Sequence, residues 1–439
     1  MPAEESRLLV QLETKNRALL NEITSWSIDS DYLVTTDGFE FSCYHPQDPS
    51  IIRGLALEPV ELKVNGQSQM LGRIERSRLG HNGGEVTYSG RDYLAEMVEC
   101  SIDPRVEITK EMDLFGAFTT IAGPVGIDTV YSSDDIALRN IRTGKSIAGG
   151  AGRDFKALKA EEIKPGHGMP MMAYMARIAA RHGGTIQPAD SRNAIQVTEP
   201  DYSQPTVGRL QRLKGDQSGG NNVLRGVATE DFSRFPTYSL YTGSQAEASK
   251  QATANFAHIG VGTGVDIALE SIGIDHYKLS YNVFDEAGIK RTKPRGRSGG
   301  NYDTATAAMG FAPSAEELIL DHCHIGRRLP SDGTADPLPL YRLLAVRDKT
   351  CRNQAQVDRL AVRQVGERLK DLLVYEVEVQ GHTDPSTGAI WSVDTMVDVL
   401  DEECDIAEPM WVSRRRLSFD PNSGARTSMT LWRPGAFIT

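Results

Sequence analysis

The sequence predicts a mainly β protein with α+β insertions, with two antiparallel β-barrel domains, one near each end of the chain. Three observations carry this prediction. The 439 residues include 41 glycines and 21 prolines that recur between short apolar runs, which is typical of β domains with many turns. Apolar and polar residues alternate in two regions, around 39–88 and 375–431. Hydrophobic residues make up 39% of the chain, which is enough to bury cores.

The first β domain is expected over residues 30–115. Asp37-Gly38 and Asn65-Gly66 are hairpin signals, because such pairs readily adopt the positive φ angles of a tight turn. Apolar residues two apart flank these turns, at Phe39, Phe41, Cys43, Val60, Leu62, Val64, Val86 and Tyr88. The pattern then becomes helical at Leu94, Met97 and Val98. We therefore expect an antiparallel meander that ends in a short helix.

Residues 1–29 are predicted to be a helical extension that precedes this domain. Apolar residues there fit helical spacing among charges, at Leu8, Leu9, Leu12, Leu19, Leu20 and Ile23. Such spacing favours a short amphipathic helix packed on its own domain or on a neighbour.

Residues 116–205 are predicted to form a small α+β domain. Met172, Met175, Ala176 and Ala179 repeat at helical spacing, and Gly183-Gly184 ends that helix. Two short strands are expected after it, around 185 and 195–197.

The second β domain is expected to combine residues 206–242 with 351–439, and to enclose an inserted α/β domain at 243–350. A helix is predicted over 357–372. The clearest alternation follows it, with apolar positions at Tyr375, Val377, Val379, Trp391, Val393, Val397, Val399, Leu417, Phe419, Met429 and Leu431, and Thr427 begins the last strand. Turns are expected at 384–388 and 420–424.

Net charge and cysteine content argue against several classes of protein. The net charge is −11, whereas a general nucleic-acid binder has a basic surface. The cysteines are odd in number and form no CxxC pair, which argues against a disulfide scaffold or a zinc ribbon: Cys43, Cys100, Cys323, Cys351 and Cys404. No apolar run reaches the roughly 18 residues of a membrane span, and we see no signal-peptide pattern. We expect reduced thiols in a protein that folds in a cytoplasm.

Each pattern that suggests catalysis or ligand binding is incomplete. Gly260, Gly262 and Gly264 lack the rest of a dinucleotide or phosphate-loop motif, so a plain loop is favoured. His322-Cys323-His324 could place two imidazoles on a metal, but no further ligand lies at familiar spacing.

The motif Ser89-Gly90-Arg91-Asp92 is not a nucleophile elbow, since no G-x-S-x-G sequence occurs. We expect Asp92 to cap the following helix and Arg91 to form an ion pair. A basic cluster could meet an acidic partner, although a solvated loop is favoured: Lys290, Arg291, Lys293, Arg295 and Arg297. No catalytic, cofactor-binding or metal site is predicted.

Three segments together resemble the hub proteins of contractile phage tails, specifically the P-type tail protein of Mu-like phages. The first joins VNGQSQMLGRIE at 64–75 to VTYSGRDYLAEMVECS at 86–101. The second, from IKPG at 163 to IAARHGG at 178–184, is similar to that family's LysM-like module. The third runs from Arg352 to the end and includes VQGH, MWVS and TSMTLWRPGAF. Residues 1–29 and 243–350 depart from the family pattern.

The resemblance implies tube-protein-like barrels and a homotrimeric ring with pseudo-six-fold symmetry. The ring would join the hexameric tail tube, or a tube initiator, to the trimeric central spike, with inner baseplate or wedge proteins beside it. DNA would pass through the channel without specific binding, and the protein would reside in the virion baseplate after assembly in the bacterial cytoplasm. Two alternatives stay open: a peptidoglycan-binding or wall-degrading tail component, and the hub of a headless tailocin or related injection system.

Overall fold

The computed structural model describes residues 8–12, 17–19, 23–44, 57–79, 85–108, 114–132, 165–231 and 370–434, with short gaps in the last two ranges, and four further strands. The chain divides into two compact units. The first unit combines 1–142, 159–228 and 374–432. The second contains β13 (Tyr238–Thr242) paired with β16 (Leu343–Arg347), and β14 (His276–Lys278) paired with β15 (Arg327–Leu329).

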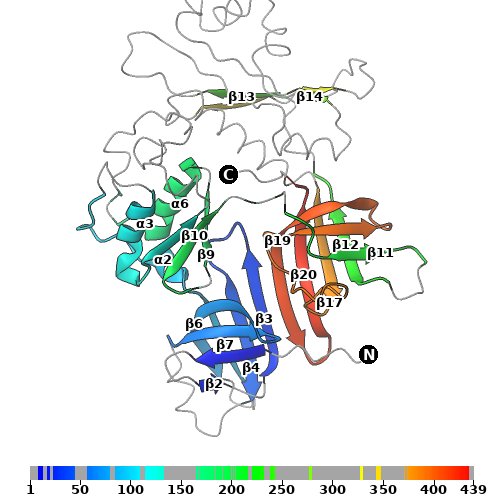
Figure 1. Ribbon diagram of the computed structural model, residues 1–439, viewed down its shortest axis with the longest axis horizontal. Helices are drawn as coiled ribbons and strands as arrows, with labels where there is room; N and C mark the ends of the chain where they lie inside the picture. The colour runs from blue at the N-terminus through cyan, green and yellow to red at the C-terminus, as the bar shows by residue number, and fades with distance from the viewer. Residues whose placement is uncertain are drawn as a thin grey trace, which may run out of the picture. The chain divides into compact units, whose positions relative to one another are not determined.

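A large sheet dominates the first unit (Figure 1) and falls into two halves, of which the second is interrupted in sequence between β12 and β17. The first β-half consists of β1 (Leu8–Leu12), β2 (Arg17–Leu19), β3 (Ile23–Asp31), β4 (Gly38–Tyr44), β5 (Pro59–Val64), β6 (Gln67–Leu79) and β7 (Glu85–Asp92). The second β-half consists of β11 (Arg209–Arg212), β12 (Val223–Thr229), β17 (Val374–Gln380), β18 (Met396–Asp401), β19 (Ile406–Asp420) and β20 (Gly424–Trp432).

The two β-halves repeat one strand order. In the first it is β3-β4-β7-β6-β5-β1, and in the second it is β12-β17-β20-β19-β18-β11. The halves differ in strand direction at the end of this order, where β1 pairs antiparallel with β5 but β11 pairs parallel with β18.

Backbone irregularities recur at matching places in the two halves. β6 carries a bulge opposite β7 between Ile74 and Arg76, and β19 carries one opposite β20 between Val412 and Arg414. β5 and β18, which precede the long strands β6 and β19, each begin two residues after a non-glycine residue with positive φ. These residues are Leu57, with a φ of 64°, and Asp394, with a φ of 55°. Since bulges and positive φ are locally costly, their repetition indicates a duplicated β unit.

The same pair of backbone hydrogen bonds holds both of these bends. Leu57 N donates to Ile74 O, and Ile74 N donates to Glu58 O. In the second half Asp394 N donates to Val412 O, and Val412 N donates to Thr395 O.

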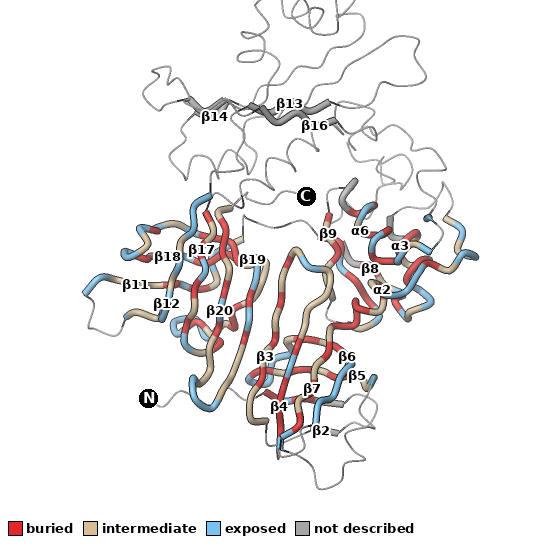
Figure 2. The backbone as a smooth tube through the Cα atoms, turned by 180° about the vertical axis from the view of Figure 1, so that it is seen from behind, coloured by how far each residue is buried: buried red, intermediate tan, exposed pale blue. Residues whose placement is uncertain are grey.

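Alternation explains the strands. Positions in β5 and β17 alternate between buried and more exposed, which Figure 2 shows as alternating colours along the main sheet. The first half buries Phe41, Leu62, Ile74 and Tyr88 in one core. The tight turn predicted at Asn65-Gly66 is confirmed, with both residues at positive φ.

Three local predictions were wrong. Residues 8–12 and 17–19 are strands and not a helix, because β1 pairs with β5 and with β2. Asp37-Gly38 is not a two-residue turn, since Gly38 begins β4 and residues 32–37 make the connection. Trp391 and Val393 lie in a loop after the turn at 384–388.

A small α/β module follows the first β-half. It contains α2 (Ala95–Glu99), α3 (Leu114–Ala122), the 3-10 turn η1 (Gly123–Val125), β8 (Thr129–Ser132), α6 (Met171–His182), β9 (Thr185–Pro188) and β10 (Ala194–Thr198). The strand order is β8-β10-β9, and the predicted helix and two strands at 172–197 are confirmed. Phe118, Tyr174, Met175 and Ile195 are buried in its core.

Hydrogen bonds fix this module to the first β-half. Tyr93 Oη donates to Ala194 O at 2.6 Å and accepts from Ala189 N at 2.7 Å. Gln187 Nε2 donates to Tyr32 O at 2.7 Å.

The large sheet confirms the prediction of a mainly antiparallel β protein. Barrel closure, the LysM-like assignment and the domain boundaries stay predictions.

Candidate functional site: the joint between the two β-halves

The two β-halves are joined into one sheet where β3 pairs antiparallel with β19. The register runs from Asp31 opposite Arg414 to Trp26 opposite Phe419. Main-chain hydrogen bonds between strands fix both distance and register. We call this pairing the internal joint.

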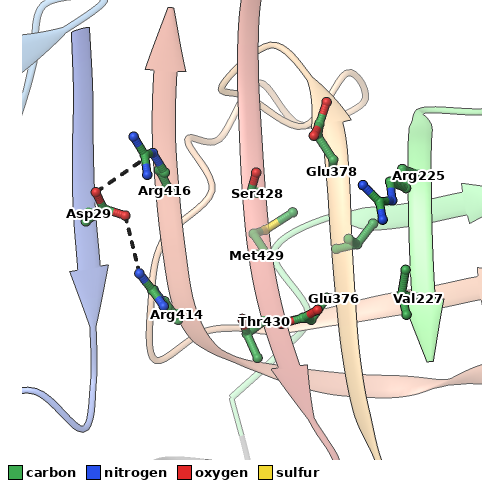
Figure 3. Close-up of a pocket in the computed structure, with 11 residues that line it drawn as sticks. Asp29, Arg225, Val227, Glu376, Glu378, Arg414, Arg416, Ser428, Met429 and Thr430 are labelled. Atoms are coloured by element: carbon green, nitrogen blue, oxygen red, sulfur yellow. Dashed lines mark ion pairs between the residues drawn. The ribbon is translucent and has the colours of Figure 1, made fainter. Parts of the chain in front are cut away.

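An ion-pair cluster lies on the outer face of the internal joint (Figure 3). The carboxylate of Asp29 on β3 lies 3.7 Å from the Arg414 guanidinium and 3.8 Å from that of Arg416. The three side chains line one side of a shallow depression of about 310 Å³ that extends over β20, β17 and β12. Exposed ion pairs of this kind contribute about 0–1 kcal/mol each, so they help to set the register more than they stabilise the fold.

The inner side of the joint holds a buried cation, Arg415. Its guanidinium donates from Nη1 to Trp391 O at 2.6 Å and to Gln69 Oε1 at 2.9 Å. Nη2 donates to Ser30 Oγ at 3.3 Å. These acceptors come from both β-halves, so one side chain binds the halves together. Burial lowers the pKa of Arg415 to about 10, which leaves it charged at neutral pH.

Two carboxyls of the first β-half complete the buried network. Asp37 N donates to Asp92 Oδ2 at 2.9 Å, and Asp37 Oδ1 accepts from Asp31 N at 3.0 Å. Burial raises the pKa of Asp37 to about 6, an increase that hydrogen bonds and the charge of Arg415 oppose. Burial and the neighbouring Asp37 raise the pKa of Asp92 to about 7. The network therefore balances one cation against carboxyls that burial makes hard to ionise.

His382 packs across the joint from the second β-half. Its ring lies 4.9 Å from that of Trp26 on β3, and Nδ1 is 3.2 Å from Thr427 Oγ1. Burial, and then the charge of Arg415, lower the pKa of His382 to about 4. The imidazole and the Thr427 hydroxyl are both buried, so a substrate has no access to this pair, which serves packing and not nucleophilic chemistry.

The Ser89–Asp92 motif has a structural role. Asp92 Oδ1 accepts from Leu94 N at 3.0 Å, directly before α2. Arg91 forms ion pairs with Glu75 at 2.8 Å and with Glu99. Gly90 is required because a Cβ there would lie 1.9 Å from Arg73 O. The predicted ion pairing of Arg91 is confirmed. Asp92 binds the backbone of the turn before α2 but is not its cap, since the N-cap residue is Leu94 and no side chain caps the helix.

The remaining candidate motifs lie outside the described residues. These are the glycine cluster at Gly260, Gly262 and Gly264, the pair His322 and His324, the basic cluster from Lys290 to Arg297, and most of the predicted helix at 357–372. Cys43, Cys100 and Cys404 are free thiols, and Cys323 and Cys351 also lie outside.

Sequence reasoning missed Arg415, Asp37 and His382. A signal existed for the first of them, since Arg414, Arg415 and Arg416 are consecutive in an alternating strand. Three consecutive arginines in a strand must direct at least one side chain to the inner face. Within the part of the chain that the structure describes, no group of three or more acidic, histidine or cysteine side chains could hold a metal ion. No helix in that part is both long and apolar enough to cross a membrane.

Two solved structures share this architecture over nearly the whole chain. The tail protein from Neisseria meningitidis is 18% identical and matches with a TM-score of 0.63, covering 99% of this chain and 98% of that one. The 43 kDa tail protein of prophage MuSo2 from Shewanella oneidensis is 15% identical, with a TM-score of 0.60 and coverage of 98% and 99%. The chain has the fold of these tail proteins. No protein-family model matches the sequence, and no curated protein does.

Both neighbours are named as tail proteins, and the second of them comes from a prophage. The polar groups of the internal joint hold the two β units of this fold together.

Proposed function

We propose that this protein is the baseplate hub of a contractile tail: a homotrimeric ring that joins the hexameric tail tube to the trimeric central spike. One observation carries the proposal. A single chain contains two β-halves with the same strand order, fixed to each other by the internal joint. Three such chains would present six similar β units around one axis, which reconciles a six-fold tube with a three-fold spike. The fold shared with two tail proteins supports this choice.

The proposed ring would have several partners. The six β units would meet the tube or a tube initiator, and the α/β module and the second compact unit would be available to the spike and to inner baseplate or wedge proteins. DNA would pass through the channel without specific binding, which suits a net charge of −11. The protein would act in the virion baseplate, with no cofactor and no catalytic step.

Mass determination tests the proposal most simply. Native mass spectrometry of the purified full chain should give a species of three times 48.1 kDa. Co-purification should then capture the spike protein encoded beside it. A chain that stays monomeric at micromolar concentration, with and without its spike, would contradict the hub.

A wall-binding role is the competing function, suggested by the α/β module at 163–200. This module is bonded to the first β-half through Tyr93 and Tyr32, which favours packing over glycan recognition. Pull-down on purified peptidoglycan should leave the full chain in the supernatant; retention on the pellet, or clearing in a cell-wall zymogram, would support the competing function. Whether the machine is a phage or a headless tailocin is decided by capsid and terminase genes nearby.

A further inference from the structure

The repeated strand order shows which segment of the first β-half is equivalent to the part of β19 that pairs with β3 in the internal joint. When the two bulges are aligned, Arg76, Ser77, Arg78 and Leu79 of β6 become the counterparts of Arg414, Arg415, Arg416 and Leu417 of β19. In β19 this segment pairs with β20 along one edge and with β3 along the other. In β6 it pairs with β7, and no strand in the described part of the chain lies along its other edge.

The side chains of residues 76–79 are more exposed than those of residues 414–417, as we expect for a segment that lacks a partner strand on one edge. Leu417 is fully buried under β3, whereas its counterpart Leu79 is 48% exposed. Arg76 and Arg78 are exposed, at the places where Arg414 and Arg416 bind Asp29 in the internal joint. An open strand edge with two exposed arginines and an exposed leucine directly after them is suited to receive another strand.

β12 is the counterpart of β3, and it is also an end strand. It pairs with β17 and is the last strand of the sheet in the described part of the chain. Its Leu224 and Val227 are 41% and 38% exposed. Soluble proteins usually protect such edges with charged side chains, proline or a bulge. The sequence of β12, VLRGVAT, has no proline, and its one charged residue is the exposed Arg225. Glu230, exposed directly after it, offers a carboxylate to basic neighbours.

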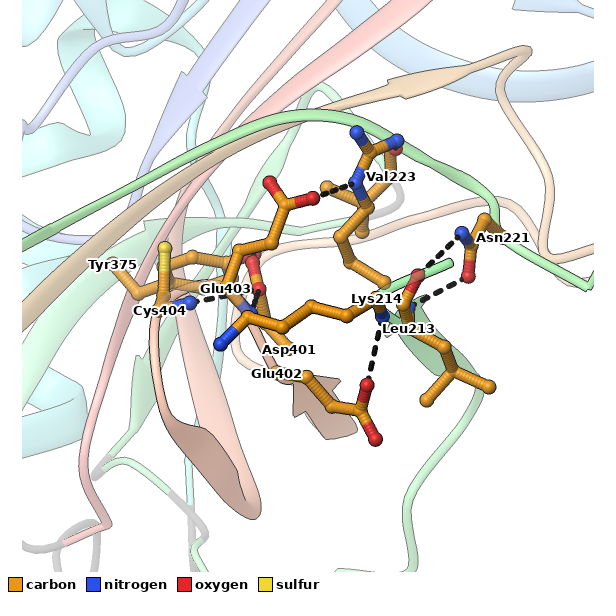
Figure 4. A network of polar contacts seen from close by, with 10 residues as sticks. Leu213, Lys214, Asn221, Val223, Tyr375, Asp401, Glu402, Glu403 and Cys404 are labelled. Carbon is orange, nitrogen blue, oxygen red and sulfur yellow. Dashed lines mark hydrogen bonds and ion pairs between the residues drawn. The ribbon is translucent and has the colours of Figure 1, made fainter. Parts of the chain in front are cut away.

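A polar network within the single chain holds β12 in place (Figure 4). Tyr375 Oη donates to Asp401 Oδ2 at 2.6 Å, and a Cβ at Gly226 of β12 would lie 2.6 Å from that Oη. Arg212 Nη1 donates to Val223 O at 3.4 Å, and Leu213 N donates to Asn221 Oδ1 at 2.8 Å. A preorganised edge loses less entropy on pairing.

We infer that β12 of one copy pairs antiparallel with residues 76–79 of β6 in a second copy of this chain, as β3 pairs with β19 within the chain. The strands β17, β20, β19, β3, β4 and β7 lie between β12 and β6 in the sheet order, and β12 and β6 are not paired with each other in the described part of the chain. The contact is head to tail, and in a closed ring of three copies it alternates with the internal joint. The inference rests on the proposed ring and names the surfaces that close it.

Substitutions on the two edges test the inference in the full-length chain. Leu79→Asp and Leu224→Asp each place a charge in the proposed contact, and both sites are exposed in the single chain. Each should weaken association at least about 100-fold, because an apolar contact is replaced by a buried unpaired charge. The matched control is Val34→Asp, which changes an equally exposed residue in the β3–β4 connection. Arg76→Glu with Arg78→Glu provides a second variant that changes only exposed residues.

Mass photometry over a dilution series, with circular dichroism melting as the folding check, gives distinct outcomes. Trimers for the wild type and Val34→Asp, with folded monomers for the edge variants, support the inference. Trimers for all variants, including the double charge reversal, overturn it and leave the hub proposal standing. A wild type that never associates, even with its spike, contradicts the proposed function and the inference together.

Discussion

The internal joint and the open edge of β6 present the same backbone with different side chains, and the difference separates folding from assembly. At the position where β19 has the buried Arg415, β6 has Ser77. Arg415 bonds to groups from both β-halves, so the internal joint must form as the chain folds. Ser77 buries no charge, and the edge that contains it can stay open in the single chain.

Removing Arg415 should have the largest effect on the internal joint. Arg415→Ala removes the donor to Gln69, Ser30 and the Trp391 carbonyl and the positive charge near Asp37. We expect a loss of about 3–5 kcal/mol in the free energy of unfolding. Urea denaturation of the full chain measures it. Arg414→Ala, the exposed neighbour, should cost no more than about 1 kcal/mol. Equal losses for the two variants would show that Arg415 does not lock the joint.

Truncating the two equivalent leucines should separate the joint from the open edge. Leu417→Ala should cost about 2–5 kcal/mol because it leaves a cavity under β3. Leu79→Ala should change the stability of the single chain by no more than about 0.5 kcal/mol. The measurement is denaturation at a concentration too low for association. A large loss for Leu79→Ala would mean that its segment is already covered in the single chain.

Two glycine substitutions compare a tightly packed position in the first β-half, Gly90, with an open one, Gly123. Gly90→Ala should destabilise the protein by about 1–3 kcal/mol or more, since the added methyl would meet Arg73 O and the Phe39 ring. Gly123→Ala in η1 meets nothing within 4 Å and should be nearly neutral. Thermal melting compares them, and similar melting temperatures for both variants would contradict the close packing of β7 on β6.

The buried carboxyls give the joint a pH dependence. The folded-state pKa values of Asp37 and Asp92 lie above the ordinary 3.8, so their contribution to stability is present below pH 4 and lost as pH rises to about 7. His382 acts oppositely, because its lowered pKa favours the folded state as pH rises from about 4 to 6.5.

Asp92→Asn isolates the carboxyl contribution. Relative to the wild type, this variant should gain stability between pH 4 and pH 8, by roughly 1.4 kcal/mol per unit of pKa shift removed. Urea titrations at pH 4, 6 and 8 measure the difference, in which the effect of His382 cancels. A difference that stays constant with pH would exclude Asp92 as a titrating group.

The sequence predicted the strands whose signal is local, and it failed where distant pairing decides. β5, β17 and β20 follow from alternation alone. Leu8, Leu9 and Leu12 fit helical spacing, yet Leu8, Val10 and Leu12 alternate equally well, and pairing with β5 determines the outcome. The internal joint brings Asp31 opposite Arg414, and no local pattern indicates which strands meet across that separation. The sequence does not show the duplication either, because the two β-halves share strand order and bulge positions, which depend on strand pairing.

Hydrogen exchange of the wild-type protein, compared between its associated and dissociated forms, tests the ring most directly. If β12 pairs with β6 of the next copy, peptides that contain 76–79 and 223–229 should gain protection on association, while those from β3 and residues 414–419 are protected in both forms. Association that leaves the 76–79 and 223–229 amides exchanging as fast as in the single chain would contradict the account.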